Sequence, residues 1–300
     1  MARTRLARQQ GAGLAFVAPF FVVFAVFGAF PLVYTAWVSL HDWSLLAGKQ
    51  EFLGIANYRE LLADAAFWRA LVNTLGIFLL ATIPQLILAT VLAQILNTSL
   101  RGRTGWRMGV LVPNVTSVAA VGIIFGLIFA RDYGIANWLL DIVGIDPINW
   151  RADRWAAWLA IATMVDWRWT GYNALILLAA LQSVPSDLYE AARIDGASAW
   201  RQFWSITVPM LRPTLIFVTI IATIGGIQLF TEPLLFNSGA NAIAGGNRGQ
   251  FQTVAMYLVQ QGFTGHRFGY ASTIAWVLFV IIAVASAINL ILLRRIRSAD

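Results

Sequence analysis

The chain has 300 residues, of which 59% are hydrophobic and only 12% are charged, whereas a soluble domain usually has about 25% charged residues. One core of this length cannot bury so much apolar surface, so the predicted class is an all-α integral membrane protein. The net charge of +7 comes almost wholly from arginine. Arginine on cytoplasmic loops orients membrane proteins, so we expect no nucleic-acid partner. With no cysteine, and with both histidines outside any usual ligand spacing, no thiol chemistry or metal site is expected.

Six apolar stretches are long enough to cross a lipid bilayer, which takes about 20 helical residues each. They are continuously apolar rather than alternating, which favours helices over a β-barrel. The first stretch is too long for the core of a cleaved signal peptide, so we count it as a span. We expect the spans to form one transmembrane domain over residues 1–300. The expected spans are 12–40, 71–97, 108–130, 155–182, 211–237 and 268–293.

The basic residues indicate the orientation of these spans. If the N-terminus is cytoplasmic, the inner segments carry twelve arginines and the longer outer segments carry eight basic residues. The positive-inside rule therefore places both termini in the cytoplasm. On the outer side, residues 52–70 predict a short amphipathic helix, 238–250 a flexible loop and 251–263 an interfacial helix.

The longest inner connection, residues 183–210, predicts two short helices. Ser186 is the expected N-cap of the first helix, and Gly196 suits the left-handed residue that ends it. Ser198 is the expected cap of the second helix, which Pro209 should stop. By its form alone, this segment is better explained as an ordinary hairpin that lies at the membrane surface.

The residue pattern of this loop is more specific than its two predicted helices. Glu190-Ala191-Ala192 is followed at fixed spacing by Gly196, Ile206 and Val208-Pro209. This pattern resembles the EAA loop of the permeases of ATP-binding-cassette (ABC) importers, with Val208 in place of leucine. Tyr189 and Ile194 to Ala197 resemble the carbohydrate branch of that family, as does the stretch 52–68, so the resemblance covers nearly the whole chain.

The resemblance implies a six-helix permease bundle whose cytoplasmic helix couples to an ATPase. The implied coupling residues are Glu190, Ala191, Ala192, Asp195 and Gly196. It also implies a bacterial-type cytoplasmic membrane, a second homologous permease that completes a heterodimer, two cytoplasmic ATPase subunits and an extracytoplasmic sugar-binding protein. ATP and Mg²⁺ would bind the ATPase and not this chain, which is not itself an enzyme. Consistently, the only lysine, Lys49, is followed by Gln50 and cannot form a P-loop.

Charged residues at membrane depth are costly and are functional candidates by default. Asp166 and Arg168 lie in the fourth expected span, beside aromatic residues that could stack on a sugar ring. Gln228 lies at a similar height in the fifth span. The two glycines before it are expected to loosen the helix, as in the discontinuous helices of transport sites. The predicted substrate path is Asp166, Trp167, Arg168, Trp169, Tyr172 and Gln228. Weaker candidates are Gln85, Asn114 to Ser117, Glu232 and Asn237.

The sequence also fits other interpretations. In one, the two charges form structural pairs with other helices, and the tryptophans face lipid or the second permease. A secondary transporter would need carboxylates deep in the bundle, and a membrane scaffold would need no substrate path. The sequence does not identify the sugar, although the resemblance favours a di- or oligosaccharide over a monosaccharide.

Overall fold

The computed structural model describes residues 16–44, 48–98, 101–237, 239 and 241–297, with side chains as far as Ile291. It is mostly helical, and it divides into two compact units. The first unit comprises residues 1–64 and 258–277, and the second comprises residues 65–257 and 278–300. Each unit is described by itself.

The first unit opens with an apolar helix, Phe16–Val38, which includes the π-helical turn η1 (Ala25–Ala29) and α2 (Phe30–Val38). An antiparallel hairpin follows, with β1 (His41–Ser44) paired to β2 (Gly48–Phe52), and then α3 (Ala56–Ala63). This hairpin was not predicted by the sequence. The single helix expected over 52–70 is also wrong, because α3 ends at Ala63 and Asp64 takes an extended conformation.

Hydrogen bonds and an exposed ion pair hold the first unit together. The Asn57 side chain donates to the carbonyl oxygens of Ser39 and His41, at 2.9 and 3.2 Å. Arg267 forms a two-pronged ion pair with Glu60, and the Tyr270 hydroxyl donates to Asp64 at 2.7 Å. The segment that contributes these last donors contains the π-helical turn η3 (Gln260–Thr264) and the beginning of α14 (Phe268–Arg297). Residues far apart in sequence therefore form one compact unit.

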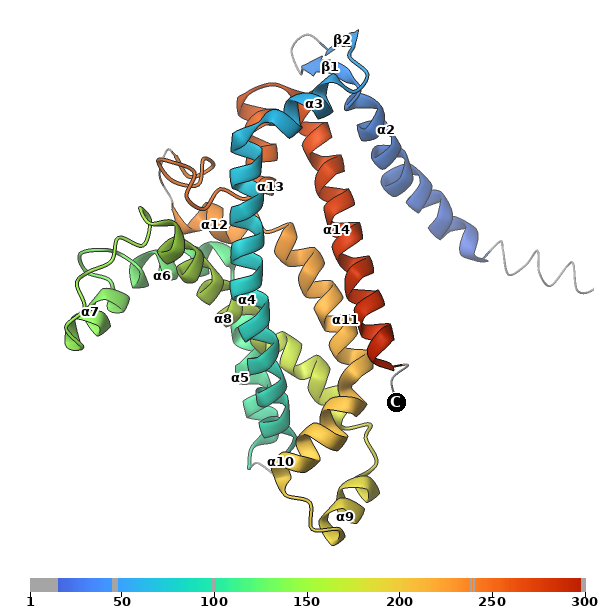
Figure 1. Cartoon of the computed structure of the whole chain (residues 1–300), viewed down its shortest axis with the longest axis vertical. Coiled ribbons are helices and arrows are strands. Elements are labelled where there is room, and N and C mark those ends of the chain that lie inside the picture. The colour runs from blue at the N-terminus through green and yellow to red at the C-terminus, as the bar shows by residue number, and fades with distance from the viewer. Residues whose placement is uncertain (1–15, 45–47, 99–100, 238, 240, 298–300) are drawn as a thin grey trace, which may run out of the picture. The chain divides into compact units, whose positions relative to one another are not determined.

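Three long helices form the core of the second unit, as Figure 1 shows. Helix α4 (Ala65–Asn97) packs along α8 (Arg154–Leu181), and α11 (Val208–Ile227) packs against both. Small residues allow these close approaches. A Cβ atom on Gly76 of α4 would lie 2.2 Å from the ring of Trp158, and one on Gly171 of α8 would lie 1.8 Å from the Val110 carbonyl oxygen.

The stretch 108–130 does not form the single straight span expected from its hydropathy. It forms α5 (Arg103–Val115) and α6 (Val118–Ile128), which meet at an angle of 87°. Thr116 between them is extended, and Ser117 precedes the first residue of α6. Pro113 lacks the N–H that would bond to the carbonyl of residue 109, so this helix end is weakened just before the bend.

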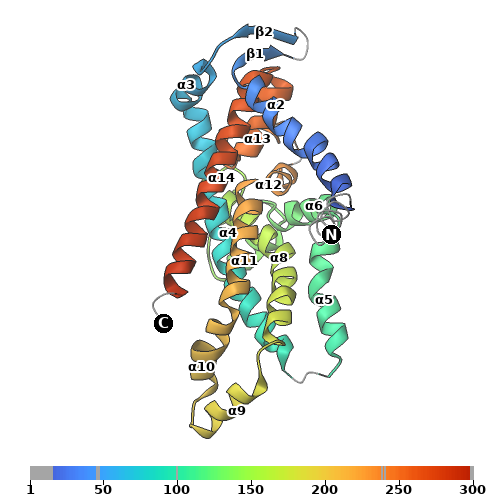
Figure 2. The ribbon, with the colours of Figure 1, turned by 90° about the vertical axis from the view of Figure 1, so that its right-hand side faces the viewer.

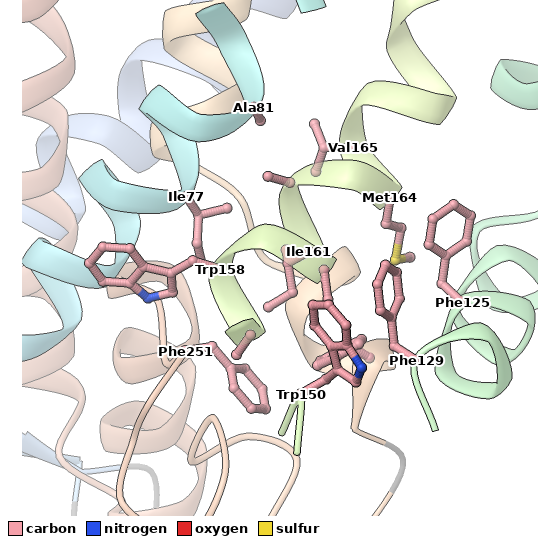
Figure 3. Close-up of a cluster of buried hydrophobic side chains, with 14 of the residues drawn as sticks. Ile77, Ala81, Phe125, Phe129, Trp150, Trp158, Ile161, Met164, Val165 and Phe251 are labelled. Carbon is pink, nitrogen blue, oxygen red and sulfur yellow. The ribbon is translucent and has the colours of Figure 1, made fainter. Parts of the chain in front are cut away.

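The apolar core of the second unit gathers around Ile161 of α8 (Figure 3). Trp150 stacks edge-on against Phe129, with ring centroids 4.9 Å apart. Phe251 packs in the same way against Phe236, at 5.7 Å. The short helices α7 (Ile135–Ile142) and α12 (Thr231–Phe236) contribute residues to this core, and α13 (Val254–Val259) follows Phe251 in the chain.

The glycine- and asparagine-rich stretch 238–250, which the sequence predicts to be a flexible loop, is held by hydrogen bonds where it is described; residues 238 and 240 lie outside the described part. The Asn73 side chain donates to the carbonyl oxygens of Gly249 and Gln252, at 2.8 and 3.0 Å. The Trp158 indole donates to Gln250 at 3.2 Å. Helices α4 and α8 thus fix the loop, which its composition could not reveal.

Among the described residues, four helices are long and apolar enough to cross a membrane, or five if the bent pair α5–α6 counts as one span. The four are Phe16–Val38, Ala65–Asn97, Ala199–Ile227 and Phe268–Ile291. Both bounds of the fifth expected span, 211–237, are wrong. The helix begins earlier, at Ala199, and ends earlier, at Ile227. The 28-residue helix α8 is long enough but is interrupted by polar residues.

Candidate functional site

A cavity of about 250 Å³ lies in the second unit between α4, α8 and the end of α11. Apolar residues of the three helices form most of its wall. Amides, hydroxyls and a carboxylate interrupt that wall, and aromatic rings lie beside them. Its polar and aromatic lining residues are Phe78, Thr82, Gln85, Trp169, Tyr172, Asn173, Gln228, Phe230, Thr231 and Glu232. An apolar pocket with a few convergent polar groups is the usual form of a small-molecule site.

Two buried amides in the wall of the cavity are bonded to each other. The Asn173 side chain of α8 donates to the side-chain oxygen of Gln85 on α4, at 2.9 Å. Each amide carries both a donor and an acceptor group. This bond uses the carbonyl of Gln85 and one N–H of Asn173, so the two residues present the remaining groups of both kinds. The wall can therefore donate to a hydroxyl and accept from one.

A buried ion pair closes one side of the cavity. Arg168 of α8 bonds to Glu232 of α12, and their side chains are only 13% and 8% exposed. The Arg168 guanidinium lies 5.8 Å from the ring centroid of Trp169. Burial of a charge costs much free energy unless the charge is paired. If either residue is removed, the other is therefore left as an uncompensated buried charge.

The helix break beside this pair gives the cavity its polar floor. Helix α11 ends at Ile227, directly after Gly225 and Gly226, and α12 begins at Thr231. A Cβ atom on Gly226 would lie 2.5 Å from Phe78, so the glycine lets α4 approach. The Thr253 hydroxyl donates to the Leu229 carbonyl oxygen at 2.7 Å, which satisfies one backbone group of the break. Broken helices of this kind line the substrate sites of many transporters.

The structure divides the six residues of the predicted substrate path, five on α8 and Gln228 at the end of α11, between two hollows. Trp169, Tyr172 and Gln228 line the cavity, and Arg168 bonds to a residue of its wall. Asp166 and Trp167 line a separate hollow. Helical residues two apart do not share a face, so neighbours in sequence separate here.

The sequence reasoning ranked Gln85 and Glu232 low and missed Thr82, Asn173 and Thr231. Helical spacing could have identified Asn173. This residue lies four positions after Trp169, so both side chains lie on the same face of α8. The positions of Gln85 and Glu232 depend on contacts between distant segments, which a hydropathy pattern does not contain.

A second candidate site is the hairpin of α9 (Ser186–Ile194) and α10 (Ala199–Gln202), which lies at one end of the second unit (Figure 2). Gly196 has φ +75° and ends α9, as its sequence position predicts. The Ser198 hydroxyl caps α10 by accepting from the Arg201 N–H at 3.3 Å. The Tyr189 hydroxyl bonds to that of Thr207 at 3.0 Å and ties α9 to the following helix.

Two local expectations for this hairpin are wrong. Pro185, not Ser186, occupies the N-cap position of α9. Pro209 does not stop the second helix, because α10, the π-helical turn η2 (Phe203–Thr207) and α11 run on as one helix to Ile227. Pro209 lies in the first turn of α11, where a missing N–H costs little after the wider π-turn.

The surface of the hairpin is open. Glu190, Ala191, Asp195 and Gly196 are exposed, and Ala192 is half-buried. Apart from Gly196 and its two chain neighbours, no heavy atom of the described residues lies within 4 Å of the position that a Cβ on Gly196 would take. The small residues therefore present nearly bare backbone, which a partner's surface can approach closely.

The model of the family described as binding-protein-dependent transport system inner membrane component matches residues 13–298. The chain belongs to this family. A member of this family is a membrane-embedded transport component rather than an enzyme, and the several apolar helices agree with a multi-pass membrane protein.

Among curated members of the family, the lactose transport system permease LacF of Rhizobium radiobacter is 37% identical over 91% of each chain. The arabinooligosaccharide transport permease AraP of Bacillus subtilis is 35% identical, over 94% of this chain and 88% of its own. The trehalose/maltose transport permease MalF of Thermococcus litoralis is 33% identical, over 92% and 91%.

A crystal structure of a bacterial ABC transporter involved in import of the acidic polysaccharide alginate has the same fold. One of its chains superposes with a TM-score of 0.81 and covers 99% of both chains, at 21% identity.

Proposed function

We propose that this chain is a permease subunit of a binding-protein-dependent ABC importer for a di- or oligosaccharide. Family membership supports the importer, and the names of three relatives support the sugar. The cavity is the observation that carries the proposal. Its amides suit the hydroxyls of a sugar, and Trp169 and Tyr172 suit the apolar face of a pyranose ring.

The proposed protein crosses the membrane six times as a single domain. Four apolar helices and the bent pair α5–α6 contribute five spans. Helix α8 is the proposed sixth, because its polar residues face the cavity and other parts of the bundle. A long helix with a polar interior face suits a transport pathway more than a lipid-exposed position.

The proposed orientation puts both termini and the α9–α10 hairpin in the cytoplasm, because the arginine excess lies on that side. In this cysteine-free chain, Ser186→Cys marks the hairpin and Asn247→Cys marks the exposed part of the glycine-rich loop. We expect an impermeant thiol reagent to label only position 247 on intact cells, and both positions after the membrane is opened. Labelling of position 186 alone on intact cells would invert the proposed topology.

The proposed coupling site is the exposed surface of Glu190, Ala191, Ala192, Asp195 and Gly196 on the hairpin. A cytoplasmic ATPase subunit would dock there, with ATP and Mg²⁺ bound to that partner. Two such subunits, a second homologous permease and an extracytoplasmic sugar-binding protein complete the proposed importer. Closure of the ATPases would then move the hairpin and, through the continuous helix Ala199–Ile227, the break that forms the cavity floor.

The proposed function is tested by sugar uptake into right-side-out vesicles, or into proteoliposomes with ATP sealed in the lumen, that contain the whole transporter. We expect uptake of the sugar that copurifies with the binding protein only when ATP is supplied on the ATPase side. The matched control supplies an ion gradient without ATP. Uptake driven by that gradient alone would favour a secondary transporter, and no uptake under either condition would favour a scaffold.

A further inference from the structure

A second hollow, of about 450 Å³, lies on another face of α8 and opens to the surface of the second unit. Its α8 residues are Thr163, Asp166, Trp167, Thr170 and Gly171. The cavity uses other positions of the same helix, such as Trp169 and Asn173. Because α8 turns by about 100° per residue, the two sets point in clearly different directions.

The walls of this hollow are apolar. They are formed by Leu88 and Leu92 of α4 and by Val110 and Pro113 of α5. At its floor, Gly171 brings α8 into backbone contact with α5. Thr163 and Trp167 at the rim are exposed. The hollow is thus an open groove between helices with a polar stripe along one side.

The polar stripe is incompletely satisfied. The Oδ1 atom of Asp166 and the hydroxyl of Thr170 are shielded from solvent, and neither has a hydrogen-bond partner within the described residues. They lie one helical turn apart, so they face the same side. A carboxylate at this depth is unfavourable against acyl chains and therefore requires protein or water beside it.

We propose that a transmembrane helix of the second permease chain fills this hollow and that a lysine or arginine on that helix donates to Asp166. This inference rests on the proposed function. An ionised carboxylate only accepts hydrogen bonds, so its complement is a donor, and a cation also compensates its charge. The apolar walls fit the rest of the incoming helix.

A second copy of this chain fits the hollow less well. Within the described part of the long helices, Arg168 is the basic residue at a depth comparable to Asp166, and it already pairs with Glu232. Arg103 and Arg107 lie in the first turns of α5, before Val110 and Pro113, which line the hollow. Within the described residues, the complementary cation is therefore better supplied by a different chain.

The proposal is tested in the assembled transporter with the photo-cross-linker benzoylphenylalanine at Thr163, and at Phe217 on an exposed part of α11 as the control. We expect position 163, but not 217, to cross-link to a span of the second permease that has a lysine or arginine within one turn of the linked residue. A cross-link to another copy of this chain, or to no protein, would overturn the inference.

A charge exchange provides the second measurement. We expect Asp166→Lys to lower copurification of the second permease more than tenfold, which corresponds to about 1.4 kcal/mol or more. Replacement of the identified cation by aspartate in the same complex should restore it. If the Asp166→Lys variant still copurifies the second permease at the wild-type level, this inference is wrong and the proposed function is unaffected. If the unaltered chain brings down no second permease, the proposed function fails together with it.

Discussion

Replacement of Gly196 by tryptophan should abolish ATP-driven sugar uptake. Gly196 is exposed, has φ +75° and presents open space to an approaching surface. A large side chain there would hold the ATPase away from the hairpin backbone. We expect both uptake and copurification of the ATPase with the tagged permease to fall at least tenfold, or about 1.4 kcal/mol of docking free energy.

Backbone strain must be separated from steric exclusion, because any residue with a Cβ is disfavoured at this φ. Gly196→Asn is the matched control, since asparagine tolerates the left-handed conformation and is small. We expect it to keep most uptake. Ala192→Trp lies within α9, where no such strain arises, and should be as damaging as Gly196→Trp. Glu190→Ala should be milder because it removes one charge contact. Full ATPase binding and uptake by Gly196→Trp would show that the hairpin is not the docking element.

Disruption of the Arg168–Glu232 pair should have the second large effect. Arg168→Met leaves Glu232 buried without its partner beside the cavity. Loss of one member of a buried ion pair typically costs about 3–5 kcal/mol of stability. We therefore expect little assembled transporter and uptake below a tenth of the wild-type rate. The measurements are the yield of complex by size-exclusion chromatography and uptake per assembled complex.

The double variant Arg168→Met, Glu232→Leu separates stability from transport. Apolar replacement of both members of a buried pair is often neutral for stability, so we expect the yield of complex to recover. Uptake per complex should stay low, because the wall of the cavity has lost its carboxylate. Recovery of both yield and uptake would assign the pair a structural role only.

The local character of the chain was predictable wherever it depends on neighbouring residues. The apolar runs predicted the long helices α4, α8 and α14, although α4 begins several residues earlier than expected. Gly196 and Ser198 were predicted to end one helix and cap the next, and both do so. These features follow from conformational preferences that act within a few residues.

Features that depend on distant contacts were not predictable. The β1–β2 hairpin has little alternation of apolar and polar residues, and the 87° bend between α5 and α6 interrupts a uniformly apolar run. The described part of the loop 238–250 is composed of residues that favour disorder, yet Asn73 and Trp158 hold it in place. In each case the stabilising partner lies on another element.

The sequence by itself determined that this is a membrane protein of the permease family with the Glu190-Ala191-Ala192 motif in a loop between two apolar runs, because hydropathy and motif spacing are local properties. Only the tertiary structure decided which polar residues of α8 work together. It joined Arg168 to Glu232, 64 residues away, and Asn173 to Gln85, 88 residues away, while it turned Asp166 toward a different hollow. The position of a residue along a helix fixes the face on which its side chain lies. Tertiary packing decides which other helix contacts that face.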